Sequence, residues 1–385
     1  MALKQRKSRL NNNQSTSELS DSDTSEKLRV FSITKAPALL GFMVALLVAC
    51  YFLLTRRYEH VQNRNVVLDD DFEARDASIF SVQEIPGKGK GVIAVRDIKR
   101  GEVVIRERPL FIVPSEINTS PTALMTHHLS LLTPYQYAQF YNLSYVNFPA
   151  DHDPEIDLAE LALAIFQTNA VSAGVDSAGV FPRMARLNHG CSSAFNVVYS
   201  WREKEGLLVV HALKDVRKGQ ELLTTYTDTK RTRDQRRAHL RHQYSFHCTC
   251  DVCSLPNGKS KESDHRLMSM SELYAQFATW GAGVIDGVQA IEVVERIWEL
   301  GSKEGYLSER GRLAADAAWV VAAHSDVAST KAWAKVAEEW FGYEVGVDSE
   351  QVLQMQMLQI QPEGHPAWAS RKAMRVPAPT LSITA

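Results

Sequence analysis

Three cysteines fall within six residues of this 385-residue chain, in the stretch Cys248-Thr-Cys250-Asp-Val-Cys253. Three thiolates on one short loop can bind a tetrahedral Zn²⁺ ion, but they leave one coordination position empty. Cys191 is the candidate for that position, because Cys50 lies in an apolar run. His247 could replace a ligand, and reduced cysteines without a metal are the alternative. A disulfide framework would space its cysteines more widely, so the cluster indicates a metal site.

Further stretches combine residue types that bind or orient other groups. They are Lys88-Gly-Lys-Gly-Val92, Asn188-His-Gly-Cys191, Glu221-Leu-Leu-Thr-Thr-Tyr226, and Gln243-Tyr-Ser-Phe-His247, which leads into the cysteine cluster. A glycine-lysine loop alone usually just makes a turn. In this order and spacing, however, the four motifs resemble those of the SET-domain protein-lysine methyltransferases. The branch with SET and MYND domains is the most similar, over about residues 78–253.

The chain departs from that family pattern in two places. After Cys191 the usual Pro-Asn pair reads Ser192-Ser-Ala-Phe-Asn196. A second cysteine cluster is missing, so the MYND zinc module is absent from the sequence. The resemblance is therefore to a fungal-type SET protein that lacks one partner-binding element and keeps the catalytic one.

The resemblance implies transfer of a methyl group from S-adenosylmethionine to a lysine amine of a protein substrate. Such an in-line displacement needs little acid or base help, so positioning and electrostatics should supply most of the acceleration. By this resemblance Tyr226 and Tyr244 are the catalytic residues. Tyr226 would orient the reacting groups, and Tyr244 and Phe181 would line the lysine channel. The alternative for each aromatic residue is a buried structural role.

The cofactor side of the site is implied in the same way. The expected cofactor-binding residues are Lys88, Lys90, Asn169, Asn188, His189 and Phe246. His189 would fix the backbone by hydrogen bonds and would not transfer protons. The expected zinc ligands are Cys191, Cys248, Cys250 and Cys253. The zinc ion would tie the segment of Tyr244 and Phe246 onto the Asn188 loop.

Other functions compete with methyl transfer. A noncatalytic SET scaffold would bind partners through its C-terminal region and use zinc only for folding, but the retained Tyr226, Tyr244, Asn188 and His189 favour the enzyme. A zinc-dependent hydrolase is excluded, because four thiolates leave no open metal position for water. The net charge of −2 gives no sign of specific nucleic-acid binding. The basic run at 230–241 is interpreted as a solvated helix face.

The elements that must position these residues are short strands. Residues 78–82 and 91–95 alternate apolar and polar or run β-branched, with Pro86, Gly87 and Gly89 between them, which predicts a hairpin. The stretches 94–104 and 212–222 resemble each other, and each places a basic residue and a glycine between apolar runs. They predict two similar β corners in which glycine allows a tight connection.

Helical spacing appears in two regions. Between 121 and 168 it predicts a helical insertion inside the β domain. After a polar loop at 256–264, apolar faces that include Trp298, Trp333 and Trp340 predict a small array of helices with these tryptophans in its core.

Together the patterns predict an α+β protein, with a SET-type β fold of short sheets, a helical insertion, a zinc-bound post-SET loop and an all-α C-terminal region. The predicted segments are a disordered tail (1–35), a membrane-spanning helix (36–54), a linker (55–77), the SET domain (78–230, with the insertion at about 114–180), the post-SET zinc segment (231–255), the helical region (265–361) and a frayed tail (362–385).

The membrane-spanning helix is predicted from an uncharged apolar stretch, residues 36–54. Such a helix would rise about 28 Å, close to the hydrocarbon core of about 30 Å. A buried core helix and a secretory signal are the alternatives. The positive charges near its two ends almost balance, and the need for reduced thiolates breaks the tie. The sequence thus predicts a single-pass membrane protein whose catalytic domain faces the cytosol.

Overall fold

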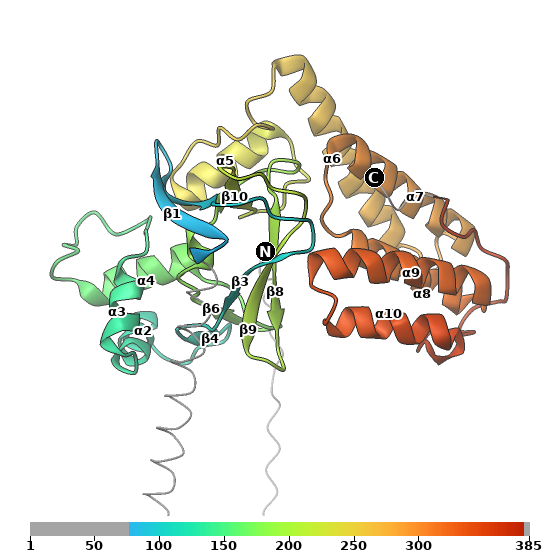
Figure 1. Ribbon diagram of the computed structural model, residues 1–385, viewed down its shortest axis with the longest axis horizontal. Helices are drawn as coiled ribbons and strands as arrows, with labels where there is room; N and C mark the ends of the chain where they lie inside the picture. The colour runs from blue at the N-terminus through green and yellow to red at the C-terminus, as the bar shows by residue number, and fades with distance from the viewer. Residues whose placement is uncertain (1–76, 381–385) are drawn as a thin grey trace, which may run out of the picture. The chain divides into compact units, whose positions relative to one another are not determined.

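The computed structural model describes residues 77–380, in which small β-sheets with a helical insertion come first and a series of helices follows (Figure 1). The first sheet has the strand order β1-β2-β10-β7. Its strands are β1 (Phe80–Ile85), β2 (Gly89–Ala94), β10 (Glu221–Thr224) and β7 (Asn188–His189). The predicted hairpin is confirmed, since β1 and β2 pair antiparallel from Phe80↔Ala94 to Ile85↔Gly89.

The register of this sheet joins two motifs that are distant in the sequence. β10 pairs antiparallel with β2 and parallel with β7, where Leu223 lies opposite Asn188 and Thr224 opposite His189. The strand that begins at Glu221 therefore lies between the hairpin and the Asn188 motif.

The two similar β corners exist, and they bind each other. Ile98 and Val216 exchange backbone hydrogen bonds of 2.8 and 2.9 Å. Each corner's aspartate accepts a hydrogen bond from the other corner, Asp97 from the Lys218 amide at 2.8 Å and Asp215 from the Arg100 amide at 2.9 Å. The corner glycines, Gly101 and Gly219, have φ of +81° and +85°, as the sequence predicts. The corners thus form one nearly symmetric junction.

Two further sheets complete the β region. One has the order β3-β9-β8, with β3 (Val103–Glu107), β9 (Leu207–Ala212) and β8 (Val197–Arg202); the other has the order β4-β6-β5, with β4 (Ile112–Pro114), β6 (Ser177–Gly179) and β5 (Val171–Ser172). All six residues of β9 are buried, because this central strand lies between its sheet partners and the core. Their apolar faces enclose a core that includes Ile105, Phe181 and Leu208.

The helical insertion is shorter than predicted. Its helices are α2 (Pro121–Ser130), α3 (Pro134–Tyr141) and α4 (Leu158–Asn169), and they bury Met125, Phe140 and Ile165 together. The predicted limits of about 114–180 also contain the last residue of β4 and all of β5 and β6. These strands are two or three residues long, too short for a period-2 pattern to stand out. A short 3₁₀ helix, η1 (Met184–Arg186), then leads to β7.

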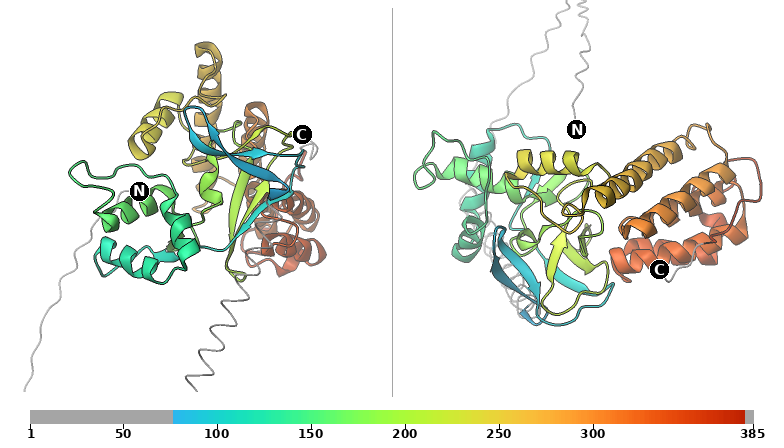
Figure 2. Two further views of the ribbon diagram at one scale, coloured as in Figure 1. Left: turned by 60° about the vertical axis from the view of Figure 1, so that its left-hand side comes forward. Right: turned by 90° about the horizontal axis from the view of Figure 1, so that it is seen from above.

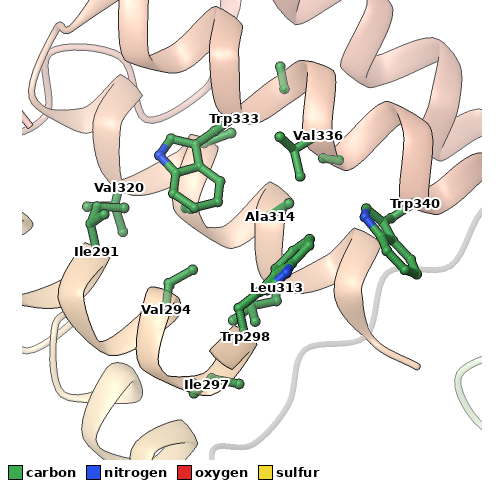
Figure 3. Close-up of a cluster of buried hydrophobic side chains, with 14 of the residues drawn as sticks. Ile291, Val294, Ile297, Trp298, Leu313, Ala314, Val320, Trp333, Val336 and Trp340 are labelled. Atoms are coloured by element: carbon green, nitrogen blue, oxygen red, sulfur yellow. The ribbon is translucent and has the colours of Figure 1, made fainter. Parts of the chain in front are cut away.

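The chain after β10 is helical, and its elements belong to the same compact unit as the sheets. They are α5 (Arg233–Tyr244), α6 (Asn257–Ala278), α7 (Gly287–Glu304), α8 (Arg310–Ala323), α9 (Val327–Glu344), α10 (Glu350–Ile360) and the 3₁₀ helix η2 (Pro362–Gly364). Figure 2 shows α7 to α10 side by side. As predicted, Trp298, Trp333 and Trp340 are in their core (Figure 3).

Two limits of this region differ from the prediction. The segment 256–264 is not a loop, since α6 already begins at Asn257. Ser260 and Ser263 of this polar segment are buried, so tertiary contacts stabilise a helix that composition does not indicate. The tail packs on α9 as far as Pro377, because Ser329 donates to the Val376 carbonyl at 2.7 Å and Trp333 Nε1 donates to the Pro377 carbonyl at 3.2 Å. The prediction of a tail frayed from residue 362 is therefore wrong over this part.

The predicted membrane localisation needs correction. Among the helices of residues 77–380, none combines the length and the apolar character needed to cross a membrane. The longest of them, α6, has 22 residues but carries many charged and polar side chains. The stretch 36–54 and the linker after it to residue 76 lie outside the described residues. A single-pass membrane protein with a cytosolic domain is thus not supported.

Candidate active site and cysteine cluster

A cavity of about 550 Å³ opens between the β1–β2 hairpin, the end of α4, β7 and the segment after α5. Its lining includes these predicted site residues: Lys88, Lys90, Asn169, Asn188, His189, Tyr226, Tyr244, Phe246, Cys248 and Cys250. Phe181 is not among them. Its side chain is fully buried in the sheet core, with its ring 6.0 Å from that of Trp201. Tyr199 of β8 lines the cavity and was missed by the sequence reasoning.

One end of the cavity is cationic. Lys88 Nζ pairs with Glu221 Oε2 at 2.5 Å, and Asn188 Nδ2 donates to Glu221 Oε1 at 2.9 Å. Lys90 Nζ instead donates to the neutral Asn142 Oδ1 at 2.8 Å, so its charge is not neutralised by that contact. Arg186 lines the same cavity. This end could therefore hold an anionic group such as a carboxylate.

Gly91 allows the hairpin to approach this end closely. A Cβ atom at Gly91 would lie 2.2 Å from Ile85 Cδ1 and 2.6 Å from Asn188 Nδ2. Any larger residue would displace Asn188, which here reaches the Lys90 carbonyl at 3.3 Å. The glycine of the glycine-lysine loop is thus required by packing at the cavity wall.

Asn169 secures the α4 side of the cavity. Its Nδ2 donates to the carbonyls of Ser144 and Ile165, each at 2.7 Å. Asn169 therefore fixes the loop after α3 to the last turn of α4, and both segments line the cavity.

The other end is aromatic. The Tyr226 hydroxyl donates to the Leu187 carbonyl at 2.7 Å, and the Tyr226 and Tyr244 rings are 5.0 Å apart. Phe246 meets Tyr226 edge-on at 6.5 Å. Burial raises the pKa of Tyr226 above its ordinary value, so the phenol stays protonated near neutral pH.

His189 joins the aromatic end to the cysteines. Its Nδ1 accepts from the Tyr226 amide at 3.0 Å, so in the neutral ring the proton is on Nε2, which lies 3.1 Å from Cys191 Sγ. Burial lowers the pKa of His189 to about 4, which keeps the ring neutral at pH 7. This geometry suits the predicted role in fixing the backbone.

The four predicted cysteine ligands come together. The sulfur atoms of Cys191, Cys248, Cys250 and Cys253 lie within 4.8 Å of one another, and all four residues are buried. Cys191 Sγ is 3.6 Å from Cys253 Sγ and 4.0 Å from Cys248 Sγ. A tetrahedral zinc site with Zn–S bonds of about 2.3 Å has sulfur separations of about 3.8 Å. The cluster therefore fits zinc, whereas His247 is exposed and lies outside it.

Of the basic residues after Tyr226, Arg231 and Arg241 are exposed, but the others do not form a solvated helix face. Arg237 donates from Nε to the Cys248 carbonyl at 3.1 Å and from Nη2 to the Cys253 carbonyl at 2.9 Å. Lys230 pairs with Glu309 at 2.9 Å, and Arg236 is completely buried. The sequence interpretation was wrong for these residues, because helix-face orientation depends on partners that are distant in sequence.

The residues that replace the family's Pro-Asn pair contact the C-terminal helices. Ser192 Oγ donates to Glu304 Oε1 at 3.0 Å, and the rings of Phe195 and Tyr306 meet edge-on at 5.8 Å. Glu304 also accepts from Ser263 at 2.6 Å. The loop after Cys191 is thus held by α6 and α7.

Comparison with known proteins agrees with this geometry. Residues 89–227 match the family model of the SET domain. The histone-lysine N-methyltransferase set5 of Schizosaccharomyces pombe is 30% identical over 197 residues, which cover 51% of this chain and 57% of the relative. ASHR1 of Arabidopsis thaliana, named a histone-lysine N-methyltransferase, is 33% identical over 148 residues (36% and 29%). SMYD3 of Homo sapiens, named likewise, is 35% identical over 75 residues (20% and 17%).

These comparisons confirm the coarser predictions. The chain carries a SET domain, its fold is α+β with small sheets and helices, and its homologues are named as histone-lysine methyltransferases. The chain spans 57% or less of the length of these three curated relatives.

Proposed function

We propose that this SET-domain chain is an S-adenosylmethionine-dependent protein-lysine N-methyltransferase. The observation that carries the proposal is the single cavity with a cationic end at Lys88 and Lys90 and an aromatic end at Tyr226 and Tyr244. The cofactor has an anionic carboxylate and the acceptor has an alkyl amine, so the two ends match the two groups that must meet. The proposed limits of the SET domain (78–230) and of the post-SET segment (231–255) are those predicted from the sequence.

The chain's contribution to the reaction is positioning. Bound S-adenosylmethionine supplies a methyl group on a sulfonium centre. Lys90 and Lys88 would hold the carboxylate, and Phe246 would offer a face for the adenine. Asn169, Asn188 and His189 would position the rest of the cofactor.

Tyr226 and Tyr244 orient the target amine. The Tyr226 hydroxyl is itself fixed by the Leu187 carbonyl, so these two oxygens would offer partial negative charge to positively charged reacting groups. Tyr199 lines the cavity and would take the channel role that the resemblance implies for Phe181. The lysine ammonium must lose one proton before transfer, because only the neutral amine can attack the methyl group. No carboxylate is among the residues that line the described cavity, so we propose that solvent takes this proton.

Zinc would act on this site through the cavity wall, because Cys248 and Cys250 are among the lining residues. The four cysteines would hold one Zn²⁺ and thereby join the Asn188 motif to the segment that carries Tyr244 and Phe246. Four thiolates close the coordination sphere, so the metal has a structural role and does not touch the substrate.

The test is a transfer assay with the full chain. Labelled S-adenosylmethionine is incubated with histones and, separately, with a protein extract, and labelled lysine is measured. We expect Tyr226→Phe to lower transfer at least about tenfold and to leave cofactor affinity by calorimetry unchanged. Tyr343→Phe is the matched control, because it removes one hydroxyl from α9, outside the cavity.

Equal turnover by wild type and Tyr226→Phe would refute the catalytic assignment. Cofactor binding without transfer to any protein would instead favour the noncatalytic scaffold that binds partners through its C-terminal helices.

A further inference from the structure

Arg236 is the only arginine in the described part of the chain whose side chain is among the largest fully buried ones. It lies on the inner face of α5, and its side chain has 0% exposure. Nη1 contacts Asp264 Oδ1 at 3.1 Å and the Arg231 carbonyl. Nε and Nη2 have no hydrogen-bond partner among residues 77–380. A buried guanidinium with unpaired N–H groups is unfavourable unless a negative charge lies beside it.

The cysteine sulfurs can supply the negative charge that the Arg236 guanidinium needs. The buried residues of α5 are Arg236 and Leu240, which lie one turn apart on the same face of the helix. Leu240 packs in the buried cluster that contains all four cysteines, so the Arg236 guanidinium lies on the face of α5 that meets this cluster. When four thiolates bind one Zn²⁺, the site keeps a net charge of about −2. A buried net charge needs a counter-charge, and Arg236 is placed to supply one.

Arg237, the next residue of α5, acts on a different part of the same loop. Its side chain donates to the backbone carbonyls of Cys248 and Cys253 and thus fixes the loop that carries three sulfurs. The two adjacent arginines therefore have different roles: Arg236 faces the sulfur atoms, and Arg237 holds the backbone of the loop.

We propose that Arg236 is the buried counter-ion of a tetrathiolate zinc site, with its Nε and Nη2 groups donating to the sulfurs of Cys253 and Cys191. Arg236 is then a positioning residue that sets how firmly the zinc is held. This inference depends on the zinc site of the proposed function. The competing explanation is that Arg236 serves only to link α5 to α6 through Asp264.

The experiment measures zinc release from the purified full chain in excess chelator, followed with a chromogenic zinc indicator. We expect Arg236→Gln to release zinc about 10- to 100-fold faster than wild type. Asp264→Asn is the matched control, because it removes the negative charge on α6 that pairs with Arg236 and leaves the guanidinium beside the cysteines. It should release zinc at the wild-type rate. Asp264→Asn releasing zinc as fast as Arg236→Gln would overturn the proposal.

If Arg236→Gln does not fold, a milder variant, Arg236→Lys, tests the same proposal. Arg236→Lys keeps the charge but loses the planar pair of donors, so its release should be several-fold faster than that of Asp264→Asn. Equal rates for these two variants would count against the proposal. A wild-type chain without zinc in metal analysis would refute the zinc site itself, whereas one zinc per chain with wild-type release from Arg236→Gln would refute this inference alone.

Discussion

Replacing Glu304 with glutamine tests how the C-terminal helices hold the loop beside Cys191. The Glu304 side chain is 2% exposed and pairs with Arg266 at 2.9 Å. It also accepts from Ser192 and Ser263. Glutamine keeps the shape, but it removes the charge and places an NH₂ group against donors. Loss of a buried charged partner costs about 3–5 kcal/mol. Because Arg266 is partly exposed and can recover water, we expect a loss of about 2–3 kcal/mol in the free energy of unfolding.

The assay is thermal and urea denaturation of the full chain. The expected loss corresponds to a fall in Tm of roughly 4–12 °C. Glu299→Gln is the control, since Glu299 lies on the same helix but is 44% exposed, and its change should stay within about 0.5 kcal/mol. A double-mutant cycle of Glu304→Gln with Ser192→Ala should show a coupling of about 0.5–3 kcal/mol. Additive effects in that cycle, or equal losses for Glu304→Gln and Glu299→Gln, would refute the reasoning.

Three further predictions concern the metal, the cavity and pH. Cys250→Ser removes one thiolate, so metal analysis should show the loss of zinc together with a lower Tm; full zinc content would contradict the site. Gly91→Ala should weaken S-adenosylmethionine binding at least about tenfold in calorimetry, because its Cβ would displace Asn188, whereas Gly258→Ala, whose Cβ meets nothing within 4 Å, should not. Burial raises the pKa of Glu344 to about 8, so the folded chain keeps a proton that the unfolded chain loses above about 4.5. Stability measured in urea should therefore fall from pH 5 to 8, and Glu344→Gln should remove that slope; an unchanged slope would exclude Glu344 as its cause.

The parts of the molecule that could be predicted from sequence depend on local spacing. Cys248, Cys250 and Cys253 are close in sequence, so they must be close in space whatever the fold. The β1–β2 hairpin likewise follows from alternation around a glycine-rich turn. The partner Cys191 could be named only because the chain offers few cysteines and because its motif resembles that of a known family.

The sequence predictions that were wrong concern the direction in which side chains point. Phe181 and Tyr199 are both aromatic, but Phe181 is buried in the sheet core and Tyr199, on β8, lines the cavity. Whether Arg236 faces solvent or sulfur depends on where the loop after α5 folds back, which is a long-range property. The same limit applies to α6, whose polar first turns are helical because Ser260 and Ser263 are buried against neighbours. Composition cannot reveal such partners.

The junction of the two β corners has a consequence for how the chain acquires its structure. Asp97 and Lys218, which meet there, are separated by 121 residues. The β1–β2 hairpin forms early from local contacts, but its inner strand pairs with β10 only after the insertion and the other sheets have been synthesised. Closing such long loops is slow, so contact order should limit the folding rate. Until then the nascent hairpin exposes an unpaired edge, which makes this strand the point where a ribosome-bound or refolding chain is most open to aggregation.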